Sequence, residues 1–248
     1  MEHLKKYGIK TFDTAQEAVQ NSDVIITFLK DGPTVLEVMQ SVADELSSSM
    51  IWLQMSTVGL FIDRLIDFSN RYQLTFFDVP VQGTKQPAEQ GQLTLMVSGD
   101  SEEKARLQPI FDAIGKQTFW ISDKPGASSR LKLALNSWVA ALTHGVAESL
   151  TLAEGLGVNP QWIVDIISGG PMDSLYFQQK SKAIIESDYA TSFSVNNALK
   201  DAEIVAAAAK QADLQLDLTQ AGLKRYLRAV KEGHGEKDMA ASGLVSKQ

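Results

Sequence analysis

The first half of the chain alternates short runs rich in β-branched and aromatic residues with longer stretches of helical periodicity. The strand-like runs are GIKTF (8–12), DVIITFL (23–29), MIWLQMS (50–56), LTFFDVPV (74–81), LTLMVSG (93–99) and QTFWIS (117–122). The stretches between them repeat apolar residues three and four positions apart, which is typical of amphipathic helices. Strands that alternate with helices predict a mostly parallel sheet covered by helices on both faces.

The second half of the chain contains no strand-like run. After Lys124-Pro125-Gly126 the apolar pattern keeps the helical period, and glycines or prolines interrupt it at intervals. We predict helices over about 128–156, after Asn159-Pro160, and over 174–187, 196–212 and 218–232. The chain is therefore expected to form an α/β domain over 1–124 and an all-α domain over 125–248.

Charge and composition exclude several classes of protein. The 248 residues contain 23 Lys and Arg against 30 Asp and Glu, a net charge of −7, which makes nucleic acid or an anionic membrane an unfavourable partner. No cysteine is present, so disulfides and cysteine-ligated zinc are excluded, and the three scattered histidines do not suggest a metal site. With no signal peptide or membrane span apparent, we expect a cytoplasmic protein.

The segment from Asp78 to Gly99 leads from the end of a strand through a glycine-containing loop into the next strand. At the carboxyl end of a strand, backbone N–H groups and short polar side chains can bind an anion such as a carboxylate. The candidates are Gln82, Gly83 and Thr84. The alternative is an ordinary loop in which glycine takes a positive φ.

The segment from Gly126 to Asn136 opens the first helix of the second half. Lys132 and Asn136 are four residues apart and therefore project from one face of that helix, among small and apolar neighbours. Partial desolvation would suit such a lysine to proton transfer. A lysine that extends to solvent beside a solvent-facing asparagine is the structural alternative.

Taken together, these segments resemble the β-hydroxyacid dehydrogenase family. The family's substrate motif, roughly DxPVSGxxxxAxxGxLxxMVxG, is matched by residues 78–99, and its GxGxxxKxxxN motif by Gly126, Lys132 and Asn136, with Ser128 in place of the second glycine. A late Lys-Asp motif is matched by Lys200-Asp201. The reductase branch is the most similar, because GTKQPAEQGQL (83–93) resembles its GSKKPAEDGQL.

The resemblance implies hydride transfer between NAD or NADP and a small 3-hydroxy acid, semialdehyde or 2-oxo acid. It makes Lys132 the general acid. The residues that would contact the substrate are Gln82, Gly83, Thr84, Asn136, Phe193 and Asp201. The residues that would contact the cofactor are Leu29, Lys30, Thr34, Thr57 and Lys200. It also implies a homodimer or tetramer that packs through the helix from Ser128.

Two departures from the family pattern qualify this expectation. Gln82 stands where the family has serine, which should reshape the substrate pocket. None of the 17 glycines forms GxGxxG, and aligned on DVIITFL the chain begins in the second helix of the family pattern. We therefore expect an N-terminally truncated Rossmann-like sheet followed by an all-helical domain.

The missing strands would lie between the runs 8–12 and 23–29. We predict that 23–29 becomes an exposed sheet edge and that the first twenty residues are rearranged, poorly ordered or paired with another chain. The missing loop also leaves open a second class of function, a non-catalytic oligomeric remnant or binding module. A start site placed too far downstream would equally explain the pattern.

Overall fold

The structure, a computed structural model, describes residue 4 and residues 6–246 of the chain. It divides into two compact units. The first comprises residues 1–83 and 87–132, and the second comprises residues 84–86 and 133–248.

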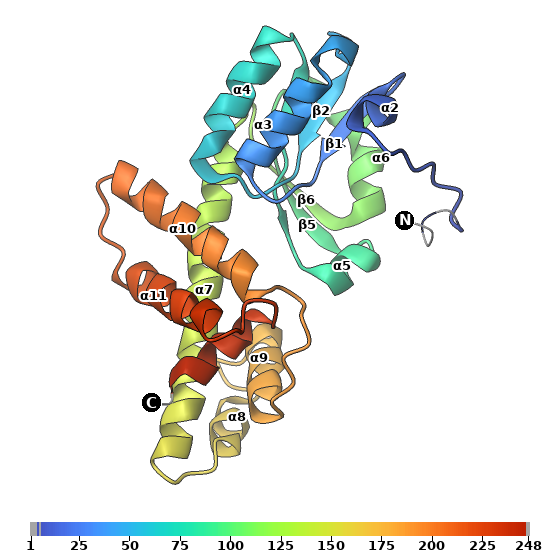
Figure 1. Cartoon of the computed structure of the whole chain (residues 1–248). Helices are drawn as coiled ribbons and strands as arrows, with labels where there is room; N and C mark the ends of the chain where they lie inside the picture. The colour runs from blue at the N-terminus through green and yellow to red at the C-terminus, as the bar shows by residue number, and fades with distance from the viewer. Residues whose placement is uncertain (1–3, 5, 247–248) are drawn as a thin grey trace. The chain divides into compact units, whose positions relative to one another are not determined.

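The first unit contains a six-stranded mixed sheet (Figure 1). Its strands are β1 (Val24–Thr27), β2 (Ile51–Gln54), β3 (Thr75–Asp78), β4 (Val81–Gln82), β5 (Leu93–Ser98) and β6 (Gly115–Ser122). Its α-helices are α2 (Ala15–Val19), α3 (Gly32–Ser41), α4 (Ile62–Arg71), α5 (Lys85–Glu89) and α6 (Lys104–Ile114), and short 3₁₀ turns occupy 43–45, 59–61 and 101–103. The order of the strands is β1-β2-β3-β5-β4, with β6 also paired to β5.

The sheet differs from the predicted, mostly parallel one at its centre. β1, β2 and β3 are parallel, and so are β5 and β6, but β5 runs antiparallel to both β3 and β4. The run predicted as one strand over 74–81 is broken at Pro80, which has no N–H to donate to a ladder. The chain then turns back through α5, so that β4 and β5 form a hairpin.

The strand predicted over residues 8–12 is wrong, since these residues have no regular secondary structure. Regular structure resumes at Thr14, which caps α2 through a capping box with Glu17. Among the described residues, β1 pairs with β2 alone and lies at the end of the strand order, which confirms the predicted exposed edge.

Two apolar clusters cover the two faces of the sheet, because successive strand residues point in opposite directions. Trp52 and Phe76 pack with α3 and α4, their rings meeting edge to face at 4.7 Å between centroids. Leu53 and Phe77, the next residues along, pack with α6. Figure 1 shows α3 and α4 side by side on one face. The amphipathic helices and alternating strands of the sequence thus account for both core layers.

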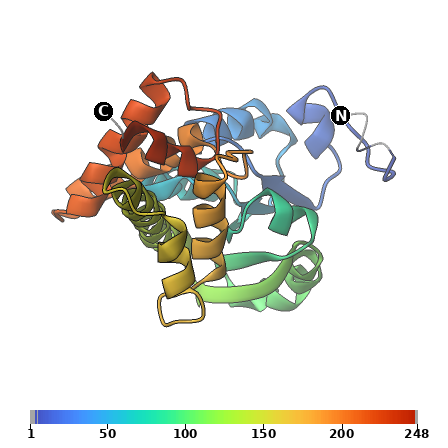
Figure 2. The ribbon, with the colours of Figure 1, turned by 90° about the horizontal axis from the view of Figure 1, so that it is seen from below.

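The second unit is helical. It contains most of α7 (Ala127–Gly155), together with α8 (Gln161–Ile167), α9 (Leu175–Ile185), α10 (Val195–Gln211), α11 (Asp217–Lys231) and the 3₁₀ helix η4 (Met239–Ser246). α11 lies on one side of α7, and α8 and α9 lie on the other (Figure 2). The predicted helices are confirmed, whereas η4 was not anticipated. Among the described residues, no helix is both long and apolar enough to cross a bilayer.

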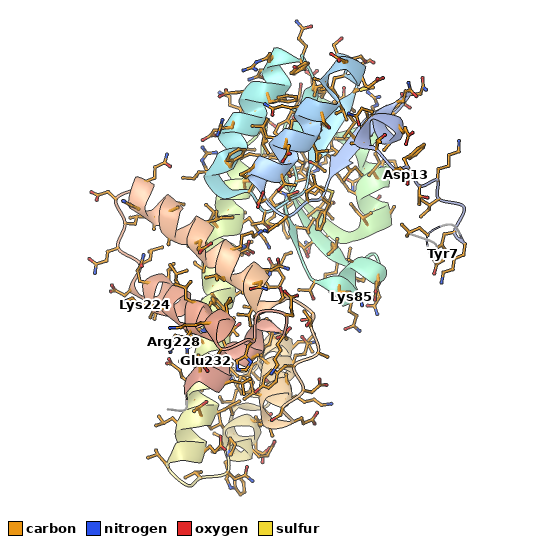
Figure 3. All side chains as sticks on the ribbon, in the orientation of Figure 1. Tyr7, Asp13, Lys85, Lys224, Arg228 and Glu232 are labelled. Carbon is orange, nitrogen blue, oxygen red and sulfur yellow. The ribbon has the colours of Figure 1, made fainter. Side chains whose placement is uncertain are left out.

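α11 shows why these helices pack as they do. Lys224, Arg228 and Glu232 follow one another along its exposed side (Figure 3). Tyr226 and Ala229, on the opposite side, are fully buried against α10 and η4. The helical period of the sequence therefore selects the face that enters the core.

A buried ion pair holds the segment before α10. Lys180 Nζ on α9 lies 2.6 Å from Asp238 Oδ1, and the two side chains are 10% and 5% exposed. The other carboxylate oxygen accepts from the hydroxyl of Ser192 at 2.7 Å and from the backbone N–H of Phe193 at 3.3 Å. Asp238 thereby fixes the position of Phe193, one of the predicted site residues.

Candidate active-site residues

The first turn of α7 is anchored to the sheet by two buried polar contacts. Asp78, at the end of β3, accepts hydrogen bonds from the backbone N–H and the hydroxyl of Ser129, both at 2.7 Å. Ser98, at the end of β5, accepts from the backbone N–H of Ser128 at 2.9 Å. These contacts supply partners for N–H groups that a helix start leaves unpaired. They also fix the position of Lys132, which lies one turn further along α7.

The side chain of Asp78 is completely buried, which destabilises the charged form of its carboxyl group. Burial raises the pKa of its carboxyl from 3.8 to about 6, and the hydrogen bonds from Ser129 only partly oppose this. The folded protein therefore holds the Asp78 proton at pH values where the unfolded chain has lost it. The contribution of this group to stability falls as the pH rises from about 4 to about 6 and stays lost above that range.

An Asp78→Asn variant is expected to lack this pH dependence. The amide oxygen can still accept from the Ser129 N–H, and the amide nitrogen can donate to the Ser129 hydroxyl. Relative to the wild type, the free energy of unfolding of the variant should rise by about 2 kcal/mol between pH 4 and pH 7. Urea unfolding at the two pH values measures this difference. Asp63→Asn, which changes an exposed carboxylate, is the control, and an equal response of both variants would contradict the assignment.

Lys132 lies one turn after these anchors and is buried, with 9% of its surface exposed. Its Nζ donates to Gln82 Oε1 at 2.8 Å. Gln82 is the last residue of β4, and Gly83 and Thr84 follow it on an exposed stretch. Gly83 has a φ of +124°, a backbone conformation that favours glycine. Lys132, the predicted proton donor, is thus in direct contact with the first of the predicted carboxylate-binding residues.

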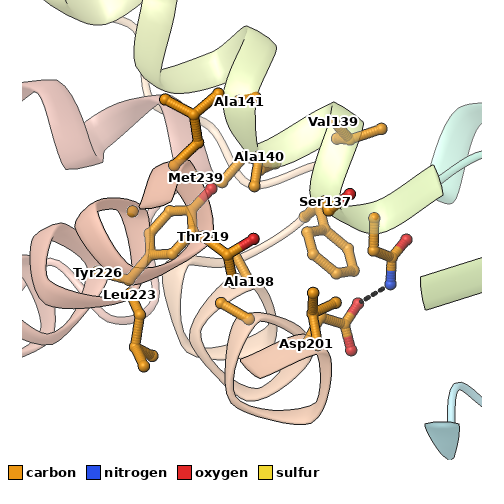
Figure 4. Close-up of a pocket in the computed structure, with 16 residues that line it drawn as sticks. Ser137, Val139, Ala140, Ala141, Ala198, Asp201, Thr219, Leu223, Tyr226 and Met239 are labelled. Atoms are coloured by element: carbon orange, nitrogen blue, oxygen red, sulfur yellow. Dashed lines mark hydrogen bonds between the residues drawn. The ribbon is translucent and has the colours of Figure 1, made fainter. Parts of the chain in front are cut away.

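A second cluster of predicted residues lies within the helical unit. Asn136 Nδ2 donates to Asp201 Oδ2 at 2.9 Å (Figure 4), and Lys200 Nζ lies 2.9 Å from Asp201 Oδ1. Asn136, Phe193 and Asp201 line a cavity of about 40 Å³ between α7, α10 and α11. The hydroxyl of Tyr226, another lining residue, is buried and makes no hydrogen bond within the part of the chain that the structure describes.

The predicted cofactor residues of the first unit follow β1 and β2. The Leu29 N–H donates to Ser56 Oγ at 2.7 Å, and Thr57 comes directly after that serine. Thr34 donates its backbone N–H and its hydroxyl to Asp31 Oδ1, at 2.9 and 2.7 Å. Lys30 is exposed. The serine hydroxyl thus holds together the carboxyl ends of the two strands.

These residues fit a nucleoside ring of a nicotinamide dinucleotide but not its pyrophosphate. Phe28, 63% exposed, and Leu29 present apolar surface on which a nucleoside ring could lie. The carboxylate of Asp31, however, caps the start of α3 and would repel a phosphate there. Between residues 6 and 246, no glycine-rich turn of the GxGxxG type opens a helix. The described residues therefore fit the ring end of the cofactor but not its pyrophosphate.

Three further polar residues lie near the predicted site residues. Ser128 and Ser129 could have been noticed as cap residues at a helix start. Tyr226 carries no sequence signal that separates it from an ordinary core tyrosine. Within the described residues, no group of three or more acidic or histidine side chains could hold a metal ion.

Two family models match the chain in succession. Residues 1–122 match the NAD binding domain of 6-phosphogluconate dehydrogenase. Residues 126–244 match the model described as NAD-binding of NADP-dependent 3-hydroxyisobutyrate dehydrogenase.

Proteins with related sequences or structures include reductases and a dehydrogenase. The chain is 25% identical to glyoxylate/succinic semialdehyde reductase 2, chloroplastic, of Arabidopsis thaliana, over 94% of this chain and 66% of that protein. It is 29% identical to 3-sulfolactaldehyde reductase of Escherichia coli, over 96% of this chain and 82% of the relative. Among solved structures, 3-hydroxyisobutyrate dehydrogenase from Salmonella typhimurium superposes with a TM-score of 0.84 at 26% identity, covering 94% of this chain and 82% of that one.

Proposed function

Because the chain belongs to the β-hydroxyacid dehydrogenase family, we propose that it interconverts a small carboxylate-bearing aldehyde or 2-oxo acid and the corresponding hydroxy acid. The observation that carries this proposal is the buried Lys132, whose Nζ lies 2.8 Å from Gln82 at the carboxyl end of β4. A buried ammonium group next to a strand end is suited to give a proton to a substrate oxygen.

Each predicted residue has a role in this reaction. Lys132 protonates the carbonyl oxygen during reduction and takes the proton back during oxidation. Gln82, Gly83 and Thr84 bind the substrate carboxylate through the side-chain amide, the backbone N–H and the hydroxyl. Asn136, held by Asp201, binds the substrate from α7, and Phe193 contributes apolar surface. A bound NAD or NADP supplies or accepts the hydride.

We assign the cofactor to the domain over 1–124, with one contact from Lys200 of the helical domain, and the helical substrate and subunit contacts to the domain over 125–248. The proposed cofactor residues are Leu29, Lys30, Thr34, Thr57 and Lys200. Their support is the position of the first four after the carboxyl ends of β1 and β2, where open parallel sheets bind nucleotides.

A homo-oligomer formed through the helical domain is part of the proposal. Trp138 on α7 and Trp162 on α8 are 61% and 60% exposed, and large aromatic side chains are enriched in subunit interfaces. Light scattering that gave the mass of one 27.1 kDa chain would contradict this part.

A second candidate function is binding without catalysis. It is favoured because the described residues do not fit a pyrophosphate. The residues proposed to bind a carboxylate, Gln82, Gly83 and Thr84, are nevertheless present. Such a protein would bind small carboxylates and leave the nicotinamide cofactor free.

Titration with NADPH and then NADH, followed by fluorescence, separates the two functions. Binding in the micromolar range, together with turnover of glyoxylate or succinic semialdehyde, would support the oxidoreductase. Absence of binding at millimolar cofactor, with retained binding of small carboxylates in calorimetry, would overturn it in favour of the binding module.

A further inference from the structure

Lys132 and Gln82 are fifty residues apart in the chain, yet their side chains meet end to end. The donor is an ammonium group and the acceptor is a neutral carboxamide oxygen, at 2.8 Å. Both residues of this contact lie on backbone segments that other hydrogen bonds hold in place. Gln82 belongs to β4, which pairs with β5 through Gln82 and Thr94, and α7 is tied to the sheet through Ser128 and Ser129.

We propose that Gln82 is a positioning residue, whose carboxamide holds the Lys132 ammonium group at the carboxyl end of β4 in the orientation required for proton transfer. This inference rests on the proposed function for its catalytic consequence. The contact itself is observed, and its effect on the reactivity of the Lys132 amine can be measured without turnover.

The chemistry of the pair explains why glutamine suits this task. A lysine side chain has four rotatable bonds, so a buried amine without a fixed acceptor would sample several positions. The Gln82 oxygen restricts that freedom by accepting one of the three Nζ hydrogens at 2.8 Å. A carboxylate in its place would form an ion pair and hold the proton more firmly. The neutral amide orients the donor and still lets it release its proton.

The length of Gln82 also narrows the substrate class. Its carboxamide oxygen occupies one hydrogen-bonding position of Lys132 Nζ, at 2.8 Å, and we infer that a substrate oxygen approaches Nζ beside the amide. A substrate with a short carbon chain between carboxylate and carbonyl satisfies this more readily than a long one. Shortening the residue to serine should therefore shift the preference from glyoxylate toward succinic semialdehyde.

The decisive experiment measures acylation of Lys132 by acetic anhydride in the full chain, resolved by mass spectrometry at fixed pH. Gln82→Met keeps the length of the side chain and removes this acceptor, so that the ammonium form of Lys132 loses one stabilising hydrogen bond. Acylation of Lys132 should be about tenfold faster in this variant. Gln82→Glu should be acylated more slowly than the wild type. Exposed Lys224 serves as the internal standard, and Gln92→Met, an exposed site, is the matched control.

Equal acylation of Lys132 in the wild type and in both Gln82 variants, with circular dichroism unchanged, would overturn the positioning role. If the wild type showed no turnover, while Lys132 were acylated fastest in Gln82→Met and slowest in Gln82→Glu, the proposed function would be refuted. The effect of the Gln82 contact on the reactivity of Lys132 would still stand. If turnover is present, Gln82→Met should lower kcat more than it raises KM. A change confined to KM would show that Gln82 binds substrate without orienting the lysine.

Discussion

Replacing Lys132 by methionine is expected to lower kcat roughly 10³-fold, because the substrate oxygen loses its positioned proton donor. The affinity for the cofactor should stay within about twofold, because a proton donor acts in the transition state and not in cofactor binding. Methionine is a suitable replacement, since it keeps most of the length of a side chain that is 9% exposed. Steady-state kinetics with glyoxylate, combined with fluorescence titration of NADPH, measures both quantities.

Two further variants make the Lys132 result specific. Lys132→Arg keeps the positive charge but cannot give up its proton near neutral pH, so its kcat should remain at least about 100-fold below that of the wild type. Lys224→Met removes a lysine from the exposed side of α11 and should retain wild-type kinetics. Turnover of Lys132→Met within tenfold of the wild type would refute the role of this residue as the general acid.

Replacing Asp238 by alanine is expected to lower the free energy of unfolding of the helical unit by about 3 to 5 kcal/mol. The change leaves the Lys180 ammonium group buried without its counter-ion, and it removes the acceptor of the Ser192 hydroxyl and of three backbone N–H groups, those of Ser192, Phe193 and Ala240. Uncompensated burial of a charge is among the most destabilising effects a single substitution has. Urea unfolding followed by circular dichroism at 222 nm measures the loss.

The matched control is an ion pair at the surface. Arg130 and Asp63 are bound at 2.8 Å, closely similar to the 2.6 Å of the buried pair, but their side chains are 47% and 54% exposed. Asp63→Ala should therefore cost less than about 1 kcal/mol. If the two alanine variants lost similar amounts, burial would not be what makes the Lys180–Asp238 pair important.

The limits of sequence-based prediction are clearest at the ends of the first strands. Residues 8–12 have strand-like composition, but a strand also needs a neighbour for its backbone hydrogen bonds, and the described residues offer none beside them. The run 74–81 predicts one strand because its apolar residues continue past Pro80. Because the proline has no N–H to donate, the strand ends before it, and the chain returns through α5. The result is two strands, β3 and β4, and an antiparallel β5.

The sequence by itself determined the types and approximate bounds of most elements, the exposed edge at β1, and the placing of Lys132 and Asn136 on one helix. These properties depend on residues within a few positions of one another, through helical and strand periodicity and backbone hydrogen bonding. Only the tertiary structure decided that Gln82 meets Lys132, that Asp78 anchors Ser129, and that Asp201 holds Asn136. Such contacts join residues fifty or more positions apart, and whether they form depends on the path of the chain and the packing of the core, which no local pattern encodes.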